Sequence, residues 1–382
     1  MNQTVPSLLS VLAQVPDPRA KRGQRHPWIA LLALIVVALL SGANTQQAIA
    51  RWGQHAGWAR LRRLGFTRRG GPSSATLRRL LQRVDVPTLE RILGTWQQQV
   101  RAAWQHSAEH WLDGIALDGK TLRGAHRLGA ADAHLLSACC QQLGVVLGQV
   151  AVPDVTSELG AVGPLLERLP LVGETVTFDA EFTQYLVAHQ VVQQGGAYLL
   201  VLKGNQPTLL RACTEATAEH PKRPRRSLGQ AQTVGLAHGR LEERRLLAVA
   251  APPDFGFPYA RQVLRLHRRR IAKGTGEVLT DETVYAVTSL RPEQASPQQL
   301  LRLWQRHWTI ENCEHWVRDV VFGEDHATTH TAHAHQALAA LRNLAIALIH
   351  LWRGSAITAA REYYATHPAV LFRRLGFTPP RL

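Results

Sequence analysis

The order of apolar segments between residues 114 and 202 constrains the fold more than any other feature of this chain. Helical patterns occupy residues 158–169 and 182–193. Short apolar runs typical of strands stand at 114–118, 134–140, 145–152, 174–179 and 197–202. Three strands in hairpin order, followed by alternating helix and strand, predict a mixed sheet with helices packed on it. We therefore expect a mixed α/β fold.

Residues 1–105 show helical apolar spacing instead, interrupted by glycine and proline. The helical stretches lie at 8–12, 28–40, 45–52 and 76–84, and residues 72–76 are typical of a loop that leads into a helix N-cap. The longest apolar run, Trp28 to Ala43, is shorter than the about 20 residues that span a bilayer, so we expect a buried helix. These patterns predict an N-terminal all-helical domain over 1–105, a core helix over 337–352 and a C-terminal tail over 353–382.

The charge of the chain is strongly basic and unevenly distributed. The sequence carries 44 Lys and Arg against 28 Asp and Glu, and residues 1–105 hold 15 of the basic residues but only three acidic ones. Such a balance favours a polyanionic partner, although a solvated basic face on a helical bundle would show the same composition. The four cysteines have no CxxC spacing, which excludes a disulfide framework or a zinc motif. With no signal peptide visible, we expect a cytoplasmic protein.

Residues 208–285 interrupt the alternation of helix and strand. Strand-like runs there carry many arginines, and a basic run stands at 222–226. We expect an antiparallel β insertion of basic character within a catalytic domain that covers 106–352. A turn at 238–240 would direct Arg240 and Arg244 towards DNA, or would belong to a plain salt-bridged hairpin.

Acidic residues at the ends of two predicted strands and on one predicted helix are candidates for a functional site. Asp118 and Asp179 end two different strands, and a helix over 297–322 would align a stripe of polar and aromatic side chains: Trp304, His307, Glu311, Glu314 and Arg318. The alternative is intrahelical pairing of Glu311 with His307 or His315 and of Glu314 with Arg318, pairs worth only about 0.2–0.5 kcal/mol each.

Together, Asp118, Asp179 and Glu311 form a three-carboxylate set of the kind that holds two divalent metals. Oxygen ligands suit Mg²⁺ or Mn²⁺, and two such ions clamp the attacking and leaving oxygens of an in-line phosphoryl displacement. Lys120, Lys203 and Arg318 are candidates to oppose the remaining negative charge. Lys203 stands in a Lys-Gly-Asn-Gln-Pro segment that would equally suit a simple strand-terminating turn.

Several motifs resemble one family of insertion-sequence transposases. They occur in a fixed order: LDGKTLRG at 117–124, DAEFTQ at 179–184, YLLVLKGNQP at 198–207, HGRLEER at 238–244, RHWTIENCEHWVRDV at 306–320 and FGED at 322–325. The chain resembles transposases of the H-repeat-associated type, in the DDE superfamily with an RNase H-like catalytic fold. Segments DPR at 17–19, RHP at 25–27 and PSSAT at 72–76 resemble the N-terminal domain associated with that family.

The resemblance implies a site and a reaction. Asp118, Asp179 and Glu311 would be the catalytic, metal-binding triad, and the signature of the glutamate helix maps onto Trp304, His307, Glu311 and Arg318. Phe182, His307 and His330 depart from the family's usual residues. By resemblance, two Mg²⁺ ions, which Mn²⁺ could replace, would support cleavage of the element ends and joining of the 3′-hydroxyl to target DNA.

The resemblance also implies partners. Residues 1–105 and the basic insertion would bind terminal inverted repeats, with Arg78, Arg79, Arg240 and Arg244 near phosphates, and the protein would dimerise on DNA beside the bacterial nucleoid. Two alternatives stay open from the residues themselves: a catalytically silent DNA-binding protein of the same fold, and a Mg²⁺-dependent nuclease without strand transfer.

Overall fold

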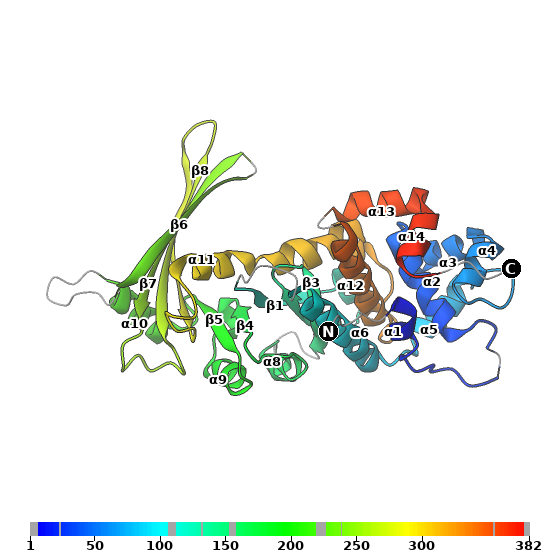
Figure 1. The fold of residues 1–382 in the computed structure, drawn as a ribbon, viewed down its shortest axis with the longest axis horizontal. Helices are drawn as coiled ribbons and strands as arrows, with labels where there is room; N and C mark the ends of the chain where they lie inside the picture. Colours follow the sequence, from blue (N-terminus) through cyan, green and yellow to red (C-terminus); the bar gives the residue numbers. More distant parts are fainter. Residues whose placement is uncertain are drawn as a thin grey trace. The chain divides into compact units, whose positions relative to one another are not determined.

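The computed structural model describes residues 7–22, 24–105, 112–130, 133–152, 158–218, 227–237, 239–353 and 356–377 (Figure 1). The chain forms two compact units, each made of separate stretches of sequence. Unit 1 comprises Met1–Glu109, Gly119–Arg168 and Thr309–Leu382, and unit 2 comprises His110–Asp118 and Leu169–Trp308. The mixed α/β class expected from the sequence is confirmed, because helices and a sheet with parallel and antiparallel pairs both occur.

Unit 2 is built on a sheet whose parallel part holds the strand ends of interest. Strand β1 (Gly114–Thr121) pairs in parallel with β4 (Thr175–Phe178), and β4 pairs in parallel with β5 (Ala197–Leu202). All four residues of β4 are buried, as expected for a central parallel strand covered on both faces. Helix α9 (Tyr185–Gln193), which follows the short turn η2 (Ala180–Phe182), connects β4 to β5.

The sheet of unit 2 continues through the segment expected to be a β insertion. Strand β5 pairs antiparallel with β9 (Val278–Thr288), which is followed across the sheet by β8 (Gln262–Ala272), β7 (Arg240–Ala250) and β6 (Ser227–Ala237). The antiparallel β character is therefore confirmed. The expectation is wrong for the first part of the segment, because Pro207–Thr217 forms helix α10. This helix starts with proline at its first position and buries Leu209, Cys213 and Thr217 at a spacing of four.

Helix α11 (Pro297–Arg306) closes the core of unit 2. Its N-terminus carries a capping box, in which Ser296 and Gln299 satisfy each other's backbone N–H groups. Leu300, Leu303 and Trp304 are buried with apolar residues of the antiparallel strands, such as Leu264 of β8. The capping box and the apolar spacing explain why this helix starts where the sequence predicts.

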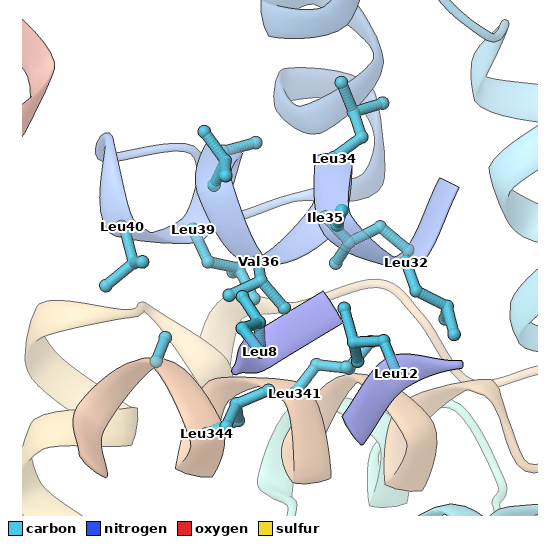
Figure 2. Packing of buried hydrophobic residues seen from close by; sticks show 14 of the residues in the cluster. Leu8, Leu12, Leu32, Leu34, Ile35, Val36, Leu39, Leu40, Leu341 and Leu344 are labelled. Carbon is cyan, nitrogen blue, oxygen red and sulfur yellow. The ribbon is translucent and has the colours of Figure 1, made fainter. Parts of the chain in front are cut away.

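Unit 1 contains the N-terminal helices. They are α1 (Leu8–Leu12), α2 (Trp28–Leu40), α3 (Gln46–His55), α4 (Trp58–Arg63), α5 (Ser74–Leu81) and α6 (Val86–Gln105). Helix α2 is the buried helix expected from its sequence, and twelve of its thirteen residues are buried. Figure 2 shows Leu8 and Leu12 of α1 between α2 and Leu341 and Leu344 of α12 (Ala334–Arg353). The predicted core helix over 337–352 is therefore confirmed.

Residues after 353 do not form a tail. They contain α13 (Ile357–Thr366) and α14 (Pro368–Arg374), whose Tyr364 and Phe372 belong to the same apolar cluster as α2. The buried Arg361 of α13 donates hydrogen bonds to the carbonyl oxygens of Leu39 and Val321. This segment thus completes the core of unit 1. Its apolar stretches are too short for the sequence alone to have predicted this packing.

Unit 1 also holds the antiparallel hairpin of β2 (His134–Cys140) and β3 (Val145–Val152), with α7 (Arg123–His126) and α8 (Glu158–Leu166). Helix α6 packs closely on β3, because Gly94 leaves room that a Cβ would fill at 2.9 Å from the Leu147 carbonyl oxygen. None of the helices in the described ranges is both long and apolar enough to cross a membrane.

Replacing Phe372 by alanine tests whether α14 belongs to the core. Phe372 is 1% exposed, so Phe372→Ala should lower the free energy of unfolding by about 3–5 kcal/mol, measured by urea denaturation. Arg373→Ala, at the exposed neighbouring position, should change it by no more than about 0.5 kcal/mol. Equal stability of the two variants would mean that the segment behaves as a tail.

Candidate active site

Two aspartates stand directly after the paired stretch of two neighbouring parallel strands. The register of β1 and β4 pairs Leu117 with Phe178, so the next residues along the chain are Asp118, within β1, and Asp179, which follows β4. Neighbouring strands lie about 4.8 Å apart, and the carboxyl ends of parallel strands share one edge of the sheet. The expectation that these acids end two strands is confirmed for Asp179 but wrong for Asp118, because β1 continues to Thr121. The pairing in unit 2 still brings the two positions together, since the paired stretch ends at Leu117 and Phe178.

Asp179 is held as a carboxylate by its surroundings. Lys203, which follows β5, places its Nζ 3.1 Å from Asp179 Oδ2. Partial burial by itself raises the pKa of Asp179, but the Ala180 N–H and Lys203, with a smaller contribution from His307, outweigh it and lower the pKa. The Lys203 side chain is 59% exposed, so it is accessible to a phosphate as well as to Asp179.

His307 links the end of α11 to strand β4. It follows the last residue of α11, is 7% exposed, and has its Nδ1 2.9 Å from the Thr177 hydroxyl oxygen. Thr177 and Asp179 are two residues apart, so an extended strand directs their side chains to the same face of the sheet. His307 therefore contacts the strand that leads to Asp179, within unit 2.

The chain beyond His307 does not continue as the single α-helix that the sequence predicts. Residues Glu311–His315 (η3) and Val317–Val321 (η4) are π-helical, with backbone hydrogen bonds five residues apart instead of four. Side-chain directions calculated at 100° per residue are therefore wrong for this segment. Glu311 is exposed, whereas Glu314 and Arg318 are fully buried.

Glu311 is fixed by a histidine one turn away. His315 Nδ1 lies 2.9 Å from Glu311 Oε2, and its Nε2 lies 2.8 Å from Glu314 Oε2. The hydrogen bond from His315 lowers the pKa of Glu311, against a smaller opposing effect of burial, and the charges of His315 and Lys120 add to it. His315 thus bridges an exposed carboxylate and a buried one, and it holds Glu311 ionised.

A buried ionic cluster supports this arrangement from within unit 1. Arg318 is 0% exposed and pairs with Glu314 and, at 2.7 Å, with Glu324, which in turn accepts a bond from Arg342 at 2.6 Å. Burial alone would raise the pKa of Glu314, but Arg318 and His315 reverse this and place the pKa well below its ordinary range. The pairs Glu311–His315 and Glu314–Arg318, considered as the alternative from sequence, both form.

The role expected for Arg318 needs correction. A side chain that is completely buried between two carboxylates presents no atom to a DNA phosphate, so Arg318 stabilises the fold beneath Glu311 instead. Lys120 is also engaged in an ion pair: its Nζ lies 2.6 Å from Asp319 Oδ1, and only 5% of its side chain is exposed. The partners Glu324 and Arg342 of this cluster were not found from sequence, because their link to Arg318 spans separate elements.

The other expected DNA contacts differ in accessibility. Arg78 and Arg79 are exposed on α5, and Arg240 opens β7, partly exposed. Arg244 is paired with Glu242, which favours the salt-bridged hairpin. Arg268 and Arg269 of β8 are likewise paired with acids of the neighbouring β9. The basic run at 222–226 and His238 lie outside the described residues.

Removing the Arg318 guanidinium should reveal its structural role. Arg318→Met leaves Glu314 buried without its main counter-charge, so it should lower the free energy of unfolding at pH 7 by about 3–5 kcal/mol. Because the lowered pKa of Glu314 contributes stability that is lost as pH falls below its ordinary value near 4.5, the deficit should shrink in acid. Exposed Arg306→Met is the control. An Arg318→Met protein of unchanged stability and weakened DNA binding would restore the phosphate role.

Glu90 offers a pH test of the adjoining network. Burial raises the pKa of this α6 carboxyl to about 7 from about 4.5, although the Gln149 amide donates to it at 2.9 Å. A raised carboxyl pKa makes the folded state lose stability as pH rises from about 4.5 to 7. At 1.36 kcal/mol per unit, Glu90→Gln should therefore be more stable than the native chain by up to about 3 kcal/mol at pH 8 and equal to it at pH 4, in urea denaturation. A difference that does not change with pH would contradict the assignment.

Comparison with known proteins agrees with this arrangement of residues. A family model described as "Transposase DDE domain" matches residues 112–348, and one described as "DDE_Tnp_1-associated" matches residues 9–97. YncI of Escherichia coli O157:H7, assigned as a transposase, is 27% identical over 352 residues, covering 91% of this chain and 88% of the relative. YhhI of Escherichia coli K12, an H repeat-associated protein assigned as a transposase, is 27% identical over 356 residues, covering 90% of both chains.

A third relative is more similar over a shorter stretch. An uncharacterized protein encoded in the dhlA 3′ region of Xanthobacter autotrophicus is 35% identical over 239 residues, which cover 61% of this chain and 77% of the relative. The match to the transposase model alone spans more than half of the sequence. The chain therefore belongs to the family of DDE transposases and is related to those of the H-repeat-associated type.

Proposed function

We propose that this protein is a metal-dependent transposase that cuts the DNA ends of its own insertion sequence and joins them to target DNA. Membership of the DDE transposase family supports an enzyme that acts on DNA. The observation that carries the reaction is the parallel register that makes Asp118 and Asp179 neighbours directly after the paired stretch of β1 and β4. We further propose an RNase H-like core, supported by the parallel β1–β4–β5 strands of unit 2 and the β2–β3 hairpin of unit 1.

The third carboxylate of the proposed triad is Glu311. It stands four positions after His307 in the chain, and His307 contacts β4. On the other side, Lys120 lies two residues after Asp118 and its charge lowers the pKa of Glu311. These two chain connections support convergence of Asp118, Asp179 and Glu311 on one shared site.

The donor set suits Mg²⁺ or Mn²⁺. All three ligands are carboxylates, and the pKa values of Asp179 and Glu311 are lowered, so both side chains are ionised at neutral pH. Two bound ions would supply Lewis acidity towards the scissile phosphate and the attacking and leaving oxygens. Family membership agrees with dependence on a divalent metal.

The protein side chains supply position and charge. His315 orients Glu311. Buried Arg318 pairs with Glu314, and Glu314 in turn holds His315 in place. His307 orients Thr177 next to Asp179, and exposed Lys203 can move from Asp179 to a phosphate oxygen. Because phosphoryl transfer depends mainly on positioning and charge neutralisation, one such site can perform both hydrolysis of an end and attack by its 3′-hydroxyl.

Both ends of an element must meet before they are joined, so we propose that the protein acts as a homodimer on DNA, within the bacterial cytoplasm and beside the nucleoid. Arg78, Arg79 and Arg240 are the accessible candidates for phosphate contacts. The excess of Lys and Arg in residues 1–105 supports a strong, salt-dependent attraction to DNA.

Substitution of each carboxylate tests the proposed triad. Asp118→Asn, Asp179→Asn and Glu311→Gln should each reduce Mg²⁺-dependent cleavage of a duplex carrying an element end by more than ~100-fold, beyond the 10–100-fold typical of groups outside the metal's ligands. EDTA should abolish cleavage, and Mg²⁺ or Mn²⁺ should restore it. Asp254→Asn and Glu362→Gln, at exposed positions, are the matched controls and should cleave normally.

Normal cleavage by any of the three triad variants would contradict the assignment of that residue. Cut ends without joined products in the native protein would instead identify a nuclease. Salt-dependent binding without any cleavage in Mg²⁺ or Mn²⁺ would identify a DNA-binding protein that has no catalytic activity.

A further inference from the structure

A strongly basic cavity lies beside α5 in unit 1, remote in sequence from the triad. We call it the α5 cavity; its volume is about 490 Å³. Five arginines line it, from the segment before α2 and from α5 and the residues that follow it: Arg19, Arg22, Arg25, Arg79 and Arg83. Ser73, the N-cap of α5, and Thr76 also line it. The two basic segments are separated by about fifty residues, so only the fold brings them together.

The positive charge of the α5 cavity is largely uncompensated. Arg19 is neutralised by Asp17, whose Oδ1 lies 2.8 Å from Arg19 Nε. No acidic side chain lines the cavity among the described residues. Arg22, Arg25, Arg79 and Arg83 are exposed at its rim. Arg79 Nε donates to the Ala75 carbonyl oxygen at 3.2 Å, which anchors the stem of that side chain and leaves its two terminal nitrogens for a ligand.

A buried histidine at the same cavity has an unused polar atom. His26 is 5% exposed, and its Nδ1 has no hydrogen-bond partner among the described residues. Buried polar atoms in proteins are almost always hydrogen-bonded, so an orphan of this kind calls for a partner. Burial lowers the pKa of His26, and Arg25, Arg19 and Arg68 add to this effect, so the ring is neutral and keeps one N–H to donate.

The apolar lining indicates which part of a polyanion would bind. The described lining includes the apolar Leu31 and Leu80, and it contains no phenylalanine, tyrosine or tryptophan on which a base could stack. Guanidinium groups match phosphate oxygens with pairs of parallel hydrogen bonds. The chemistry therefore suits a phosphodiester backbone and not a nucleobase.

We propose that the α5 cavity binds backbone phosphates of DNA through Arg22, Arg25, Arg79 and Arg83, beside the buried His26 ring. The proposal rests on the proposed function only in that the polyanion is DNA. It places α5 along the DNA backbone and makes the contact independent of base sequence. Helix α5 also contributes Arg78 to a second cavity, of about 480 Å³.

The salt dependence of DNA binding provides the test. Full-length Arg25→Gln/Arg79→Gln is compared with Arg60→Gln/Arg62→Gln, which removes the same charge from exposed positions of α4 that line neither cavity. Fluorescence anisotropy with a labelled element-end duplex and an unrelated duplex, in EDTA, gives log K against log salt. Loss of two phosphate contacts should lower the slope by about 2 for both duplexes, because each contact in B-DNA contributes about 0.9. The control should keep the native slope.

A second measurement uses the native protein and so does not depend on the folding of variants. Phenylglyoxal modifies accessible arginines, and mass spectrometry then reports each site. DNA should protect Arg22, Arg25, Arg79 and Arg83 but leave Arg60 and Arg62 reactive. Inorganic phosphate at the same ionic strength should give little protection, whereas equal protection by phosphate would identify a small-anion site and overturn the proposal.

Unchanged slopes in the cavity variant, or equal modification of these arginines with and without DNA, would also overturn it. These measurements contain no metal and register no cleavage. A failure of the triad therefore appears only in the cleavage assay, whereas a failure of the α5 cavity appears only in binding and protection.

Discussion

The parallel pairing of β1 with β4 is the constraint on which the proposed chemistry depends. Leu117 and Phe178 are paired in register, and each is followed by an aspartate. A shift of one residue would turn the side chains of one strand to the opposite face of the sheet. All of Gly114–Leu117 and Thr175–Phe178 are buried, so such a shift would exchange the side chains that pack on the two faces of the sheet. Core packing and the position of the two carboxylates are thus set by the same register.

A second constraint acts on the glutamate. Glu311 is exposed, yet its orientation is held by His315, Glu314 and Arg318, which lie at increasing depth in unit 1. Burying so many charges is costly, and an apolar cluster of equal volume would often be as stable. An ionic cluster offers directionality that an apolar one does not, because each hydrogen bond fixes the next group. We interpret the π-helical backbone as part of this arrangement, since it separates Glu311 at the surface from Glu314 in the interior.

The sequence predicted those parts of the fold that depend on local pattern. The continuous apolar run of α2 and the strand that precedes Asp179 were found where expected, whereas β1 continues past Asp118 to Thr121 and α5 begins at Ser74, within the expected loop. The helical character of α10 was missed, because its segment was assigned to a β insertion despite the proline at its first position. The π-helical turns were not predictable from a fixed 100° period. Arg318 was expected to contact DNA. Its burial depends on an ion pair with Glu324, which lies beyond the end of its helix, so the local sequence pattern did not reveal that burial.

Long-range packing accounts for the remaining differences. Helices α13 and α14 are short, and they acquire their place only through contacts with α2 and α12. The arginines of the α5 cavity stand in two segments that sequence spacing does not connect, although the basic excess of residues 1–105 already indicated a polyanionic partner. Charge composition thus predicts the class of ligand, and the folded arrangement is needed to predict where it binds.

Metal-directed cleavage of the polypeptide would measure the central claim most directly. Fe²⁺ in place of Mg²⁺, with ascorbate and peroxide, generates radicals that cut the backbone close to the bound ion. If the three carboxylates share their cations, fragments should map beside positions 118, 179 and 311 together, and excess Mg²⁺ should suppress all of them. Cuts beside only one of these positions, or cuts that Mg²⁺ does not suppress, would show that no common site joins them.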